Sequence, residues 1–190
     1  MTALDRQANL LGALALVITD QTTQAVAAAA GQSASAAAAL SALHHFLDRP
    51  TLDQLRKVLG LTPSGAVRLV DRLADAGLVR RGTGGDGRSR SVVLTEAGQR
   101  AARQITAARA ALLSSALDEL SPAERQTLHT LMSRIMASVV RSKDGGAWIC
   151  RLCDLDACGR ASGHCPAANA AAAKYANPLA ALVTVDDQVV

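Results

Sequence analysis

Four cysteines fall within sixteen residues toward the end of the chain, at Cys150, Cys153, Cys158 and Cys165. Their spacing, Cys-x2-Cys-x4-Cys-x6-Cys, can place four thiolates around one tetrahedral site. The segment is too short to fold by burying its own apolar surface, so a bound metal would supply its folding free energy. We therefore predict a metal or cluster site with these four ligands, in preference to four free thiols.

The identity of the bound group stays open between two kinds of site. The Cys-x2-Cys-x4-Cys opening resembles short zinc knuckles, whereas Cys165-Pro166 resembles ferredoxin-type ligation of an iron–sulfur cluster. Zinc is the first expectation, as a closed structural site without a catalytic role. A [4Fe–4S] or other iron–sulfur cluster is the alternative and would make the tail a redox sensor. Arg151 and Arg160 would offset the thiolate charge in both cases, and we interpret His164 as a bystander.

The beginning of the chain lacks the features of a secretory signal, namely a positively charged start, a compact apolar core and a cleavage site. The apolar run Leu10–Thr19 ends at Asp20, well short of the roughly 20 residues that a membrane span needs. We therefore expect a soluble cytoplasmic protein with no membrane partner. Disulfide bonds are not expected in that compartment.

A second candidate site is a glycine-rich loop that carries arginines. The loop, Gly82–Arg90, lies between two short β-prone runs at residues 78–81 and 91–94, which predicts a β-hairpin wing. Arg88 and Arg90 lie in this loop, and an arginine at a hairpin tip can enter a narrow minor groove. Asp86 could brace the loop by pairing with an arginine. No Gly-Lys-Ser/Thr sequence follows, which argues against a nucleotide phosphate loop.

Two helices in tandem are predicted just before this hairpin. Thr51 and Gln54 form a capping box for a short helix that ends at Gly60. Thr62-Pro63 then starts a longer helix, which is expected to run to Ala76, with threonine as N-cap and proline at the first position. A short helix, a glycine-containing turn and a longer helix make a helix-turn-helix.

The second helix of such a unit presents its first turn to base edges and phosphates. Here that turn is formed by Thr62, Pro63, Ser64 and Gly65. The hydroxyls and backbone N–H groups suit phosphate oxygens, and the glycine allows close approach of the backbone. Arg68 and Arg72 follow on the same face, where arginine can contact guanine or phosphate. The alternative for both arginines is an exposed ion pair with Asp71 or Asp75.

Charge and composition agree with a nucleic-acid-binding surface in this segment. The net charge of the chain is +4, and residues 62–103 contain eight arginines against four acids. Such a local surplus is typical of a phosphate-binding footprint, although a solvated helix face gives the same count. Aromatic residues make up only 2% of the chain, which argues against an RNA-binding surface of stacking rings.

Long helices are predicted on both sides of the winged unit. They are expected over residues 3–31, 35–47, 95–120 and 122–143, with a short one over 167–177. The first is apolar on most sides, so it should be buried, against a second subunit or in its own domain. The predicted fold is mainly α (α+β). Its regions are N-terminal dimerisation helices (1–47), a winged helix-turn-helix (48–98), C-terminal dimerisation helices (99–146) and a Cys-rich metal-binding tail (147–190).

The run from Leu61 to Gly98 resembles the core of the multiple antibiotic resistance regulator (MarR) family. The resemblance is carried by Thr-Pro-Ser-Gly, Leu-Val-Asp-Arg-Leu, Gly-Leu-Val-Arg-Arg, Asp-x-Arg and Leu-Thr-Glu-Ala-Gly, and with the flanking helices it covers about residues 5–142. It implies an obligate homodimer on a pseudo-palindromic DNA operator, Asp86 and Arg88 as the wing pair, and a cleft for a small effector. His44 and His45 lie where such a cleft could form, but we interpret them as ordinary surface or core histidines. The family's peroxide sensors carry an early cysteine, which this chain lacks before Cys150.

These observations predict a DNA-binding transcription regulator, a repressor, that acts as a homodimer on double-stranded DNA. The alternative is a winged-helix adaptor that binds another protein through a zinc docking module. An enzyme is not expected, because no Ser/His/Asp or His/Glu constellation is present and the cysteine cluster has no open coordination position.

Overall fold

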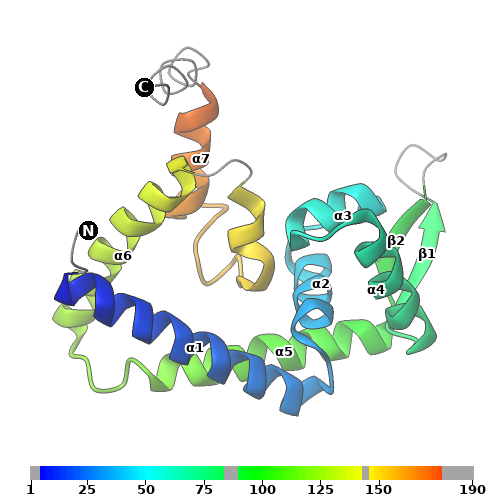
Figure 1. Cartoon of the computed structure of the whole chain (residues 1–190), viewed down its shortest axis with the longest axis horizontal. Helices are drawn as coiled ribbons and strands as arrows, with labels where there is room; N and C mark the ends of the chain where they lie inside the picture. The colour runs from blue at the N-terminus through cyan, green and yellow to red at the C-terminus, as the bar shows by residue number, and fades with distance from the viewer. Residues whose placement is uncertain (1–4, 84–89, 143–145, 177–190) are drawn as a thin grey trace. The chain divides into compact units, whose positions relative to one another are not determined.

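The structure is a computed structural model that describes residues 5–83, 90–142 and 146–176. The chain forms two compact units, Met1–Asp118 and Glu119–Val190, which we describe separately. The first contains five helices and a two-stranded sheet among its described residues, and the second contains the remaining helices (Figure 1). The predicted wing positions 84–89, including Asp86 and Arg88, lie outside the described residues.

Three helices form the base of the first unit: α1 (Arg6–Ala30), α2 (Ala34–His45) and α5 (Glu96–Ser115). Both α1 and α2 pack on α5, and α1 runs alongside it in Figure 1. The helix starts follow from capping, because Asp5 accepts the N–H of Ala8 and Ser33 accepts that of Ala36. Alanines from α2 fill much of the core, and their small side chains bring the helix backbones close together.

The winged unit contains α3 (Leu52–Leu59), α4 (Pro63–Asp75), β1 (Val79–Thr83) and β2 (Arg90–Leu94). The predicted capping box is confirmed, since Thr51 accepts the N–H of Gln54 while the Gln54 side chain accepts that of Thr51. One leucine of α3 and two of α4 are at most 2% exposed and are buried together with Ile105 of α5: Leu55, Leu69 and Leu73. Burying each stabilises the fold by about 1.5–3 kcal/mol.

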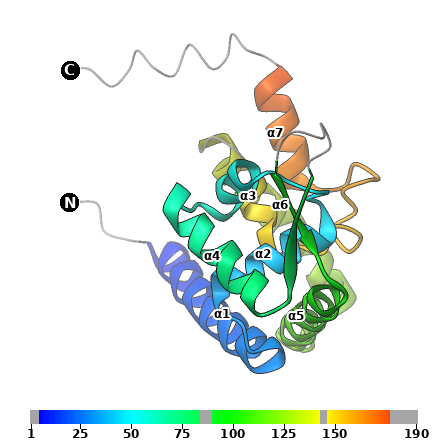
Figure 2. The same cartoon turned by 90° about the vertical axis from the view of Figure 1, so that its right-hand side faces the viewer.

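The two strands form an antiparallel hairpin in which Val79 pairs with Leu94 and Thr83 with Arg90 (Figure 2). The segment before α3 extends this sheet by a short third piece. Val92 donates its N–H to the carbonyl of Pro50 at 2.9 Å, and Thr51 forms a bridge with Ser91. The start of α3 and the hairpin are therefore fixed to each other by backbone hydrogen bonds.

The hairpin is joined to α5 by a close backbone contact. Thr95 donates its hydroxyl to the carbonyl of Gly77 at 2.6 Å and accepts the N–H of Gly98 at 3.0 Å. A Cβ atom on Gly98 would overlap the carbonyl oxygen of Leu78, so only glycine fits in the first turn of this helix. The end of the helix-turn-helix and the start of α5 are thereby held together.

The second unit contains α6 (Pro122–Ser142), the 3-10 helix η1 (Gly146–Leu152) and α7 (Pro166–Ala176). At the start of α6, the carboxylate of Glu124 accepts hydrogen bonds from the hydroxyl and N–H of Ser121, which lowers the pKa of that carboxyl. Helix α7 packs along α6 through a core of mostly small residues, Val140, Cys165, Ala167 and Ala170. We refer to residues 146–176 as the cysteine lobe.

The predicted helices are confirmed with one difference in length. Helix α5 ends at Ser115, whereas the sequence favours its continuation to about Leu120. The N–H groups of Leu117 and Asp118 bond to carbonyls three residues earlier, and these tight turns end the helix. Helices α5 and α6, which the sequence groups in one dimerisation region, consequently lie in different units.

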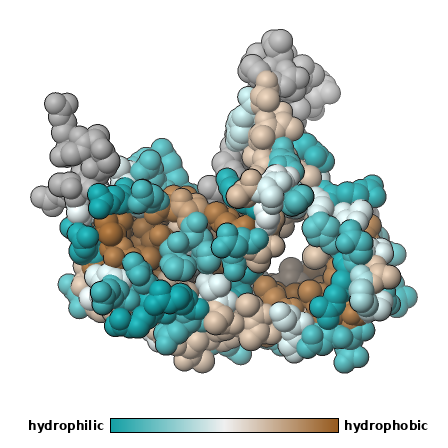
Figure 3. Space-filling view, turned by 180° about the vertical axis from the view of Figure 1, so that it is seen from behind, coloured by the Kyte–Doolittle hydropathy of each residue, from teal (hydrophilic) through white to brown (hydrophobic). Residues whose placement is uncertain are grey.

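Apolar side chains reach the surface in both units, and Figure 3 shows such hydrophobic areas among hydrophilic ones. In the first unit they belong to α1, where large apolar residues are 50–68% exposed: Leu10, Leu11, Leu14, Leu16 and Val17. By length and composition α1 is the one helix among the described residues that could cross a membrane, and 11% of its most apolar stretch is buried. A signal sequence near the N-terminus has the same length and apolar composition, and so does a core helix of a soluble protein.

The junction at Gly98 leads to a first prediction. Gly98→Ala should lower the free energy of unfolding by at least about 2 kcal/mol, because the added methyl group forces Leu78 away from α5. Gly12→Ala is the matched control, since a Cβ there meets no atom within 4 Å and alanine favours the helix. Urea denaturation followed by circular dichroism measures both. Equal stability of the two variants would contradict this role of the junction.

Candidate nucleic-acid interface and cysteine cavity

The start of α4 presents polar groups at the surface of the first unit. The Thr62 hydroxyl accepts the N–H of Gly65 at 3.1 Å and lies 3.5 Å from the Ser64 hydroxyl, and Thr62, Pro63 and Ser64 are all exposed. A Cβ atom on Gly65 would lie 3.0 Å from the Thr62 hydroxyl oxygen and would crowd this cap. The structure thus brings the four predicted residues together in one exposed helix start.

Arg68 and Arg72 lie one and two turns further along α4, and both are exposed. The proposed alternative was an ion pair with Asp71 or Asp75. In the described part of the chain neither arginine forms an ion pair, and Asp71 is engaged by Arg81 of β1 instead. The two guanidinium groups are therefore available on the same helix as the polar start.

The ion pair between Asp71 and Arg81 is a contact that the sequence analysis missed. It joins the middle of α4 to the first strand of the wing, so it helps to set the angle between these two elements. The two residues are ten positions apart on different elements, and no local pattern predicts such a pair. Both side chains are more than a third exposed, so the pair contributes little to stability and acts mainly on position.

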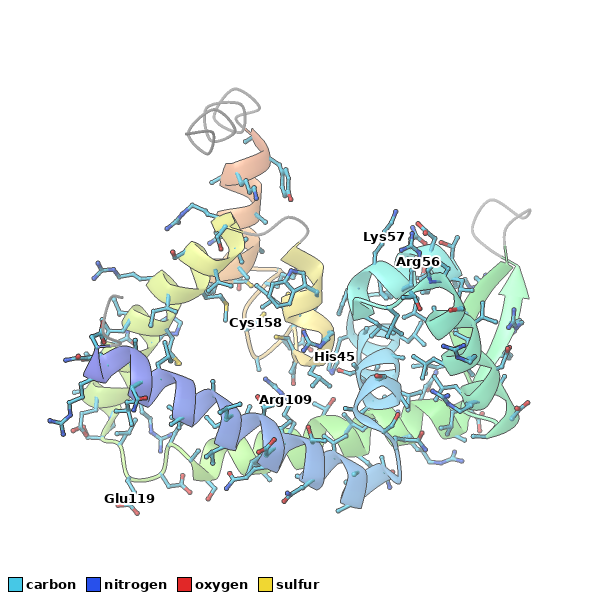
Figure 4. The ribbon with its side chains drawn as sticks, viewed as in Figure 1. His45, Arg56, Lys57, Arg109, Glu119 and Cys158 are labelled. Carbon is cyan, nitrogen blue, oxygen red and sulfur yellow. The ribbon has the colours of Figure 1, made fainter. Side chains whose placement is uncertain are left out.

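The two basic side chains at the end of α3 form ion pairs within their own helix, unlike the arginines of α4. Arg56 and Lys57 both contact the carboxylate of Asp53, at 2.6 and 2.7 Å (Figure 4). Hydrogen bonds from Lys57 and then Arg56 lower the pKa of Asp53. The basic side chains of α3 are therefore neutralised within that helix. Among the described residues of the winged unit, the arginines without an ion pair on a helix belong to α4.

The wing itself is described only at its base. Arg90 begins β2 and its backbone pairs with that of Thr83, whereas the sequence places both residues in the loop, so the two strands extend further toward the tip than predicted. Arg88 and Asp86 lie outside the described residues, and the predicted bracing of the loop stays a prediction.

All four cysteines line one cavity of about 720 Å³ in the second unit, together with side chains from α6. Cys150 and Cys165 are buried, whereas Cys153 and Cys158 are half-buried. A hydrogen bond with Cys153 lowers the pKa of Cys150 to about 6, and the nearby Arg160, which donates to that sulfur at 3.5 Å, acts in the same direction. Burial and then the neighbouring Cys165 raise the pKa of Cys158, which Figure 4 labels.

The donor set fits a soft metal, since thiolate and thioether sulfur bind zinc, copper(I) and iron–sulfur clusters. The arrangement is not that of a compact single-ion site. Across the ranges the structure describes, no group of three or more His, Cys, Asp or Glu side chains is placed so that it could hold a metal ion. His164 lines the same cavity, and its Nδ1 lies 3.0 Å from the Ser162 hydroxyl.

A second cavity, of about 390 Å³, lies in the first unit between the end of α2 and β2. His44 and His45 line it together with Phe46, Val92 and Gln99. The ring of His45 lies 3.0 Å from the hydroxyl of Thr106 on α5, and the rings of the two histidines are 4.9 Å apart. His45 thus has a partner within its own unit, and both imidazoles lie at the edge of a cavity.

A capped helix with exposed arginines, a preceding short helix and a following β-hairpin define a winged helix-turn-helix, a fold typical of DNA-binding transcription regulators. The model of the MarR family matches residues 30–89 of the chain, which include α2 to the base of the wing. The resemblance found in the sequence is thereby confirmed for this region. The match ends before the four cysteines.

Solved structures with the same fold include transcription regulators. The multidrug efflux pump regulator MepR of Staphylococcus aureus has a TM-score of 0.62 and 17% identity, over 72% of this chain and 99% of that one. A probable transcriptional regulator from Pseudomonas aeruginosa has 0.53 and 26%, over 68% and 99%. CouR from Rhodococcus jostii, solved with p-coumaroyl-CoA, has 0.53 and 21%, over 69% and 91%. No curated protein sequence matches the chain.

The cap of α4 allows the structural and DNA-binding roles of Thr62 to be separated. Thr62→Asp should leave the free energy of unfolding unchanged within about 0.5 kcal/mol, because aspartate is an equally good N-cap. DNA affinity should fall at least tenfold, because a carboxylate at the helix start repels phosphate. Thr62→Ser is the control and should keep both properties. Thermal unfolding and fluorescence anisotropy measure them, and unchanged affinity of the aspartate variant would place the helix start outside the interface.

Proposed function

We propose that the protein is a sequence-specific transcription regulator that acts as a homodimer on a pseudo-palindromic operator, as a repressor. One observation carries most of this proposal: the exposed start of α4, with Arg68 and Arg72 on the same helix and without ion pairs in the described residues. A helix of this kind fits the major groove, and we expect Arg88 and Arg90 of the hairpin that follows to contact the adjacent minor groove.

The homodimer is supported by apolar surface that a single chain leaves exposed. Helix α1 carries five large apolar side chains at least 50% exposed, and α6 carries four that are 42–49% exposed: Leu131, Met132, Ile135 and Val139. Exposed apolar surface of this kind marks a site of association. A second chain can cover α1 and α6 without a membrane, so we expect the regulator in the cytoplasm.

Ligands are proposed at both cavities. The four cysteines form a metal site in the tail, with zinc as a structural ion or an iron–sulfur cluster as its occupant. The cavity beside His44 and His45 is proposed to receive a small effector. Its volume of about 390 Å³ is within the usual range of small-molecule sites, and CouR shows that a regulator of this fold can bind an organic ligand.

DNA binding is tested by fluorescence anisotropy with the promoter region next to the protein's own gene. Affinity should fall steeply as salt rises, because arginines that neutralise phosphates release counterions. Arg68→Ala should weaken binding by about 1–3 kcal/mol. Arg109→Ala is the charge-matched control, since Figure 4 places Arg109 on α5, away from α4 in the same unit. Sedimentation of the same samples reports whether two chains associate.

Two outcomes would contradict the proposal. The first is the absence of binding at low salt to any adjacent intergenic DNA. The second is equal affinity of the Arg68 and Arg109 variants, because the α4 face would then make no specific contact. Binding of a protein partner by the same face would instead favour the adaptor.

The wing is tested separately through Arg88. Arg88→Ala should weaken DNA binding by at least about 1 kcal/mol, the scale of one lost groove contact. Arg88→Lys should recover part of the loss, because the charge remains while the planar guanidinium is absent. Anisotropy at fixed salt measures both. Wild-type affinity of the alanine variant would exclude a role of this residue in the groove.

A further inference from the structure

The outer face of α4 carries one exposed large apolar side chain, Val67. Its exposed fraction is 39%, and no other large apolar residue is exposed among the described residues of the winged unit. The remaining large apolar residues of the helix, Leu69, Val70 and Leu73, are at most 2% exposed and lie in the core. Single exposed apolar residues are common on protein surfaces, so exposure alone does not mark a site. The position of Val67 on the helix is the informative observation.

Val67 lies on the face of α4 that is proposed to contact DNA. Residues three or four positions apart are neighbours on a helix surface, so Val67 is adjacent to Ser64 on one side and to Asp71 on the other. Helical side chains lean toward the N-terminal end of their helix, which directs Val67 toward the exposed polar start. Arg68 follows directly in the sequence and is exposed as well. The valine is therefore placed among the groups that would hold the helix in the groove.

The acidic neighbour of Val67 does not prevent this face from approaching DNA. The carboxylate of Asp71 is engaged by Arg81 of β1, which offsets its negative charge. Arg68 forms no ion pair in the part of the chain that the structure describes, so its guanidinium can neutralise a phosphate. Both observations favour a close approach of the helix to a polyanion, in which the side chain of Val67 would leave water.

The chemistry of valine restricts what this side chain can recognise in a major groove. The first turns of a recognition helix contact base edges there. Valine neither donates nor accepts a hydrogen bond, so it cannot pair with the amino, carbonyl and ring-nitrogen groups that the base edges present. Thymine is the base that also presents an apolar group, the methyl group on C5. An aliphatic side chain on this face is therefore matched to thymine.

We propose that Val67 is a specificity-determining residue that contacts the C5 methyl group of one thymine in each half of the operator. This inference rests on the proposed function and adds a base preference to a surface described so far by its polar and charged groups. The apolar residues proposed to meet a second chain lie on α1 and α6, so Val67 does not belong to that surface.

The test replaces thymine by deoxyuridine, which forms the same base pair but lacks the C5 methyl group. Footprinting with the full chain first locates the bound site in the promoter region next to its own gene, and each thymine of that site is then replaced in turn. At one position in each half-site, affinity should fall about fourfold, which corresponds to the loss of one methyl group from an apolar contact. Fluorescence anisotropy at fixed salt measures the affinities.

A variant connects this effect to Val67. For Val67→Ala, the thymine and deoxyuridine forms of that position should bind with nearly equal affinity, and the variant should fold normally because the side chain is exposed and alanine favours a helix. Comparing two proteins on two DNAs separates the contact from changes in DNA shape. Val139→Ala is the matched control, because Val139 is 42% exposed on α6, outside the winged unit. Whatever its effect on dimerisation, it should keep the fourfold difference.

The outcomes separate this inference from the proposed function. Wild-type protein that binds the site in a salt-dependent way but shows no methyl effect at any thymine would overturn the inference alone. A methyl effect that Val67→Ala retains in full would also overturn it alone, because another residue would then read the methyl group. Absence of binding to any adjacent DNA at low salt would contradict the proposed function and the inference together.

Discussion

The junction of Leu78, Thr95 and Gly98 is the constraint on which the arrangement of the first unit depends. The carbonyl of Leu78, in the turn after α4, occupies the position that a Cβ atom on Gly98 would take. The Thr95 hydroxyl hydrogen-bonds both to the carbonyl of Gly77 in that turn and to the N–H of Gly98 in α5. The end of α4, the hairpin and the start of α5 are therefore fixed at one point. Arg81 adds a second link by pairing with Asp71. These contacts hold α4 and the base of the wing in one geometry, which is what two adjacent grooves of DNA require.

Local chemistry explains why much of this unit could be predicted from the sequence. The caps at Thr51 and Thr62 depend on residues within three positions, so the helix starts were placed correctly. The turn at Gly60 was placed correctly for the same reason, because its φ of 67° favours glycine. The polar start of α4 then follows from the cap itself, and its exposure follows from the apolar face on the other side of the helix.

Contacts between distant segments could not be predicted in the same way. Neither the Asp71–Arg81 pair nor the close approach of the Leu78 carbonyl to Gly98 leaves a local pattern, although Gly98 stands in a motif that the family resemblance identified. The early end of α5 at Ser115 was missed because the residues that follow it favour a helix, while backbone turns end it. The cysteine spacing indicated a shared site, but only the structure shows that the four cysteines line one cavity together with side chains of α6.

Helix α6 connects the proposed dimer surface with the cysteine lobe. Val139 is 42% exposed, whereas its neighbour Val140 is 2% exposed and lies in the core with α7. In the same way, Ile135 is exposed whereas Met136 packs against the core with α7. Consecutive residues on a helix point about 100° apart. The helix therefore has two adjacent apolar faces, one exposed and one covered by the cysteine lobe. Met132 belongs to both, since it is 47% exposed and also lines the cavity. A group bound by the cysteines would contact the same helix whose other face is proposed to meet a second chain, so that its loss could change dimerisation without any direct contact with DNA.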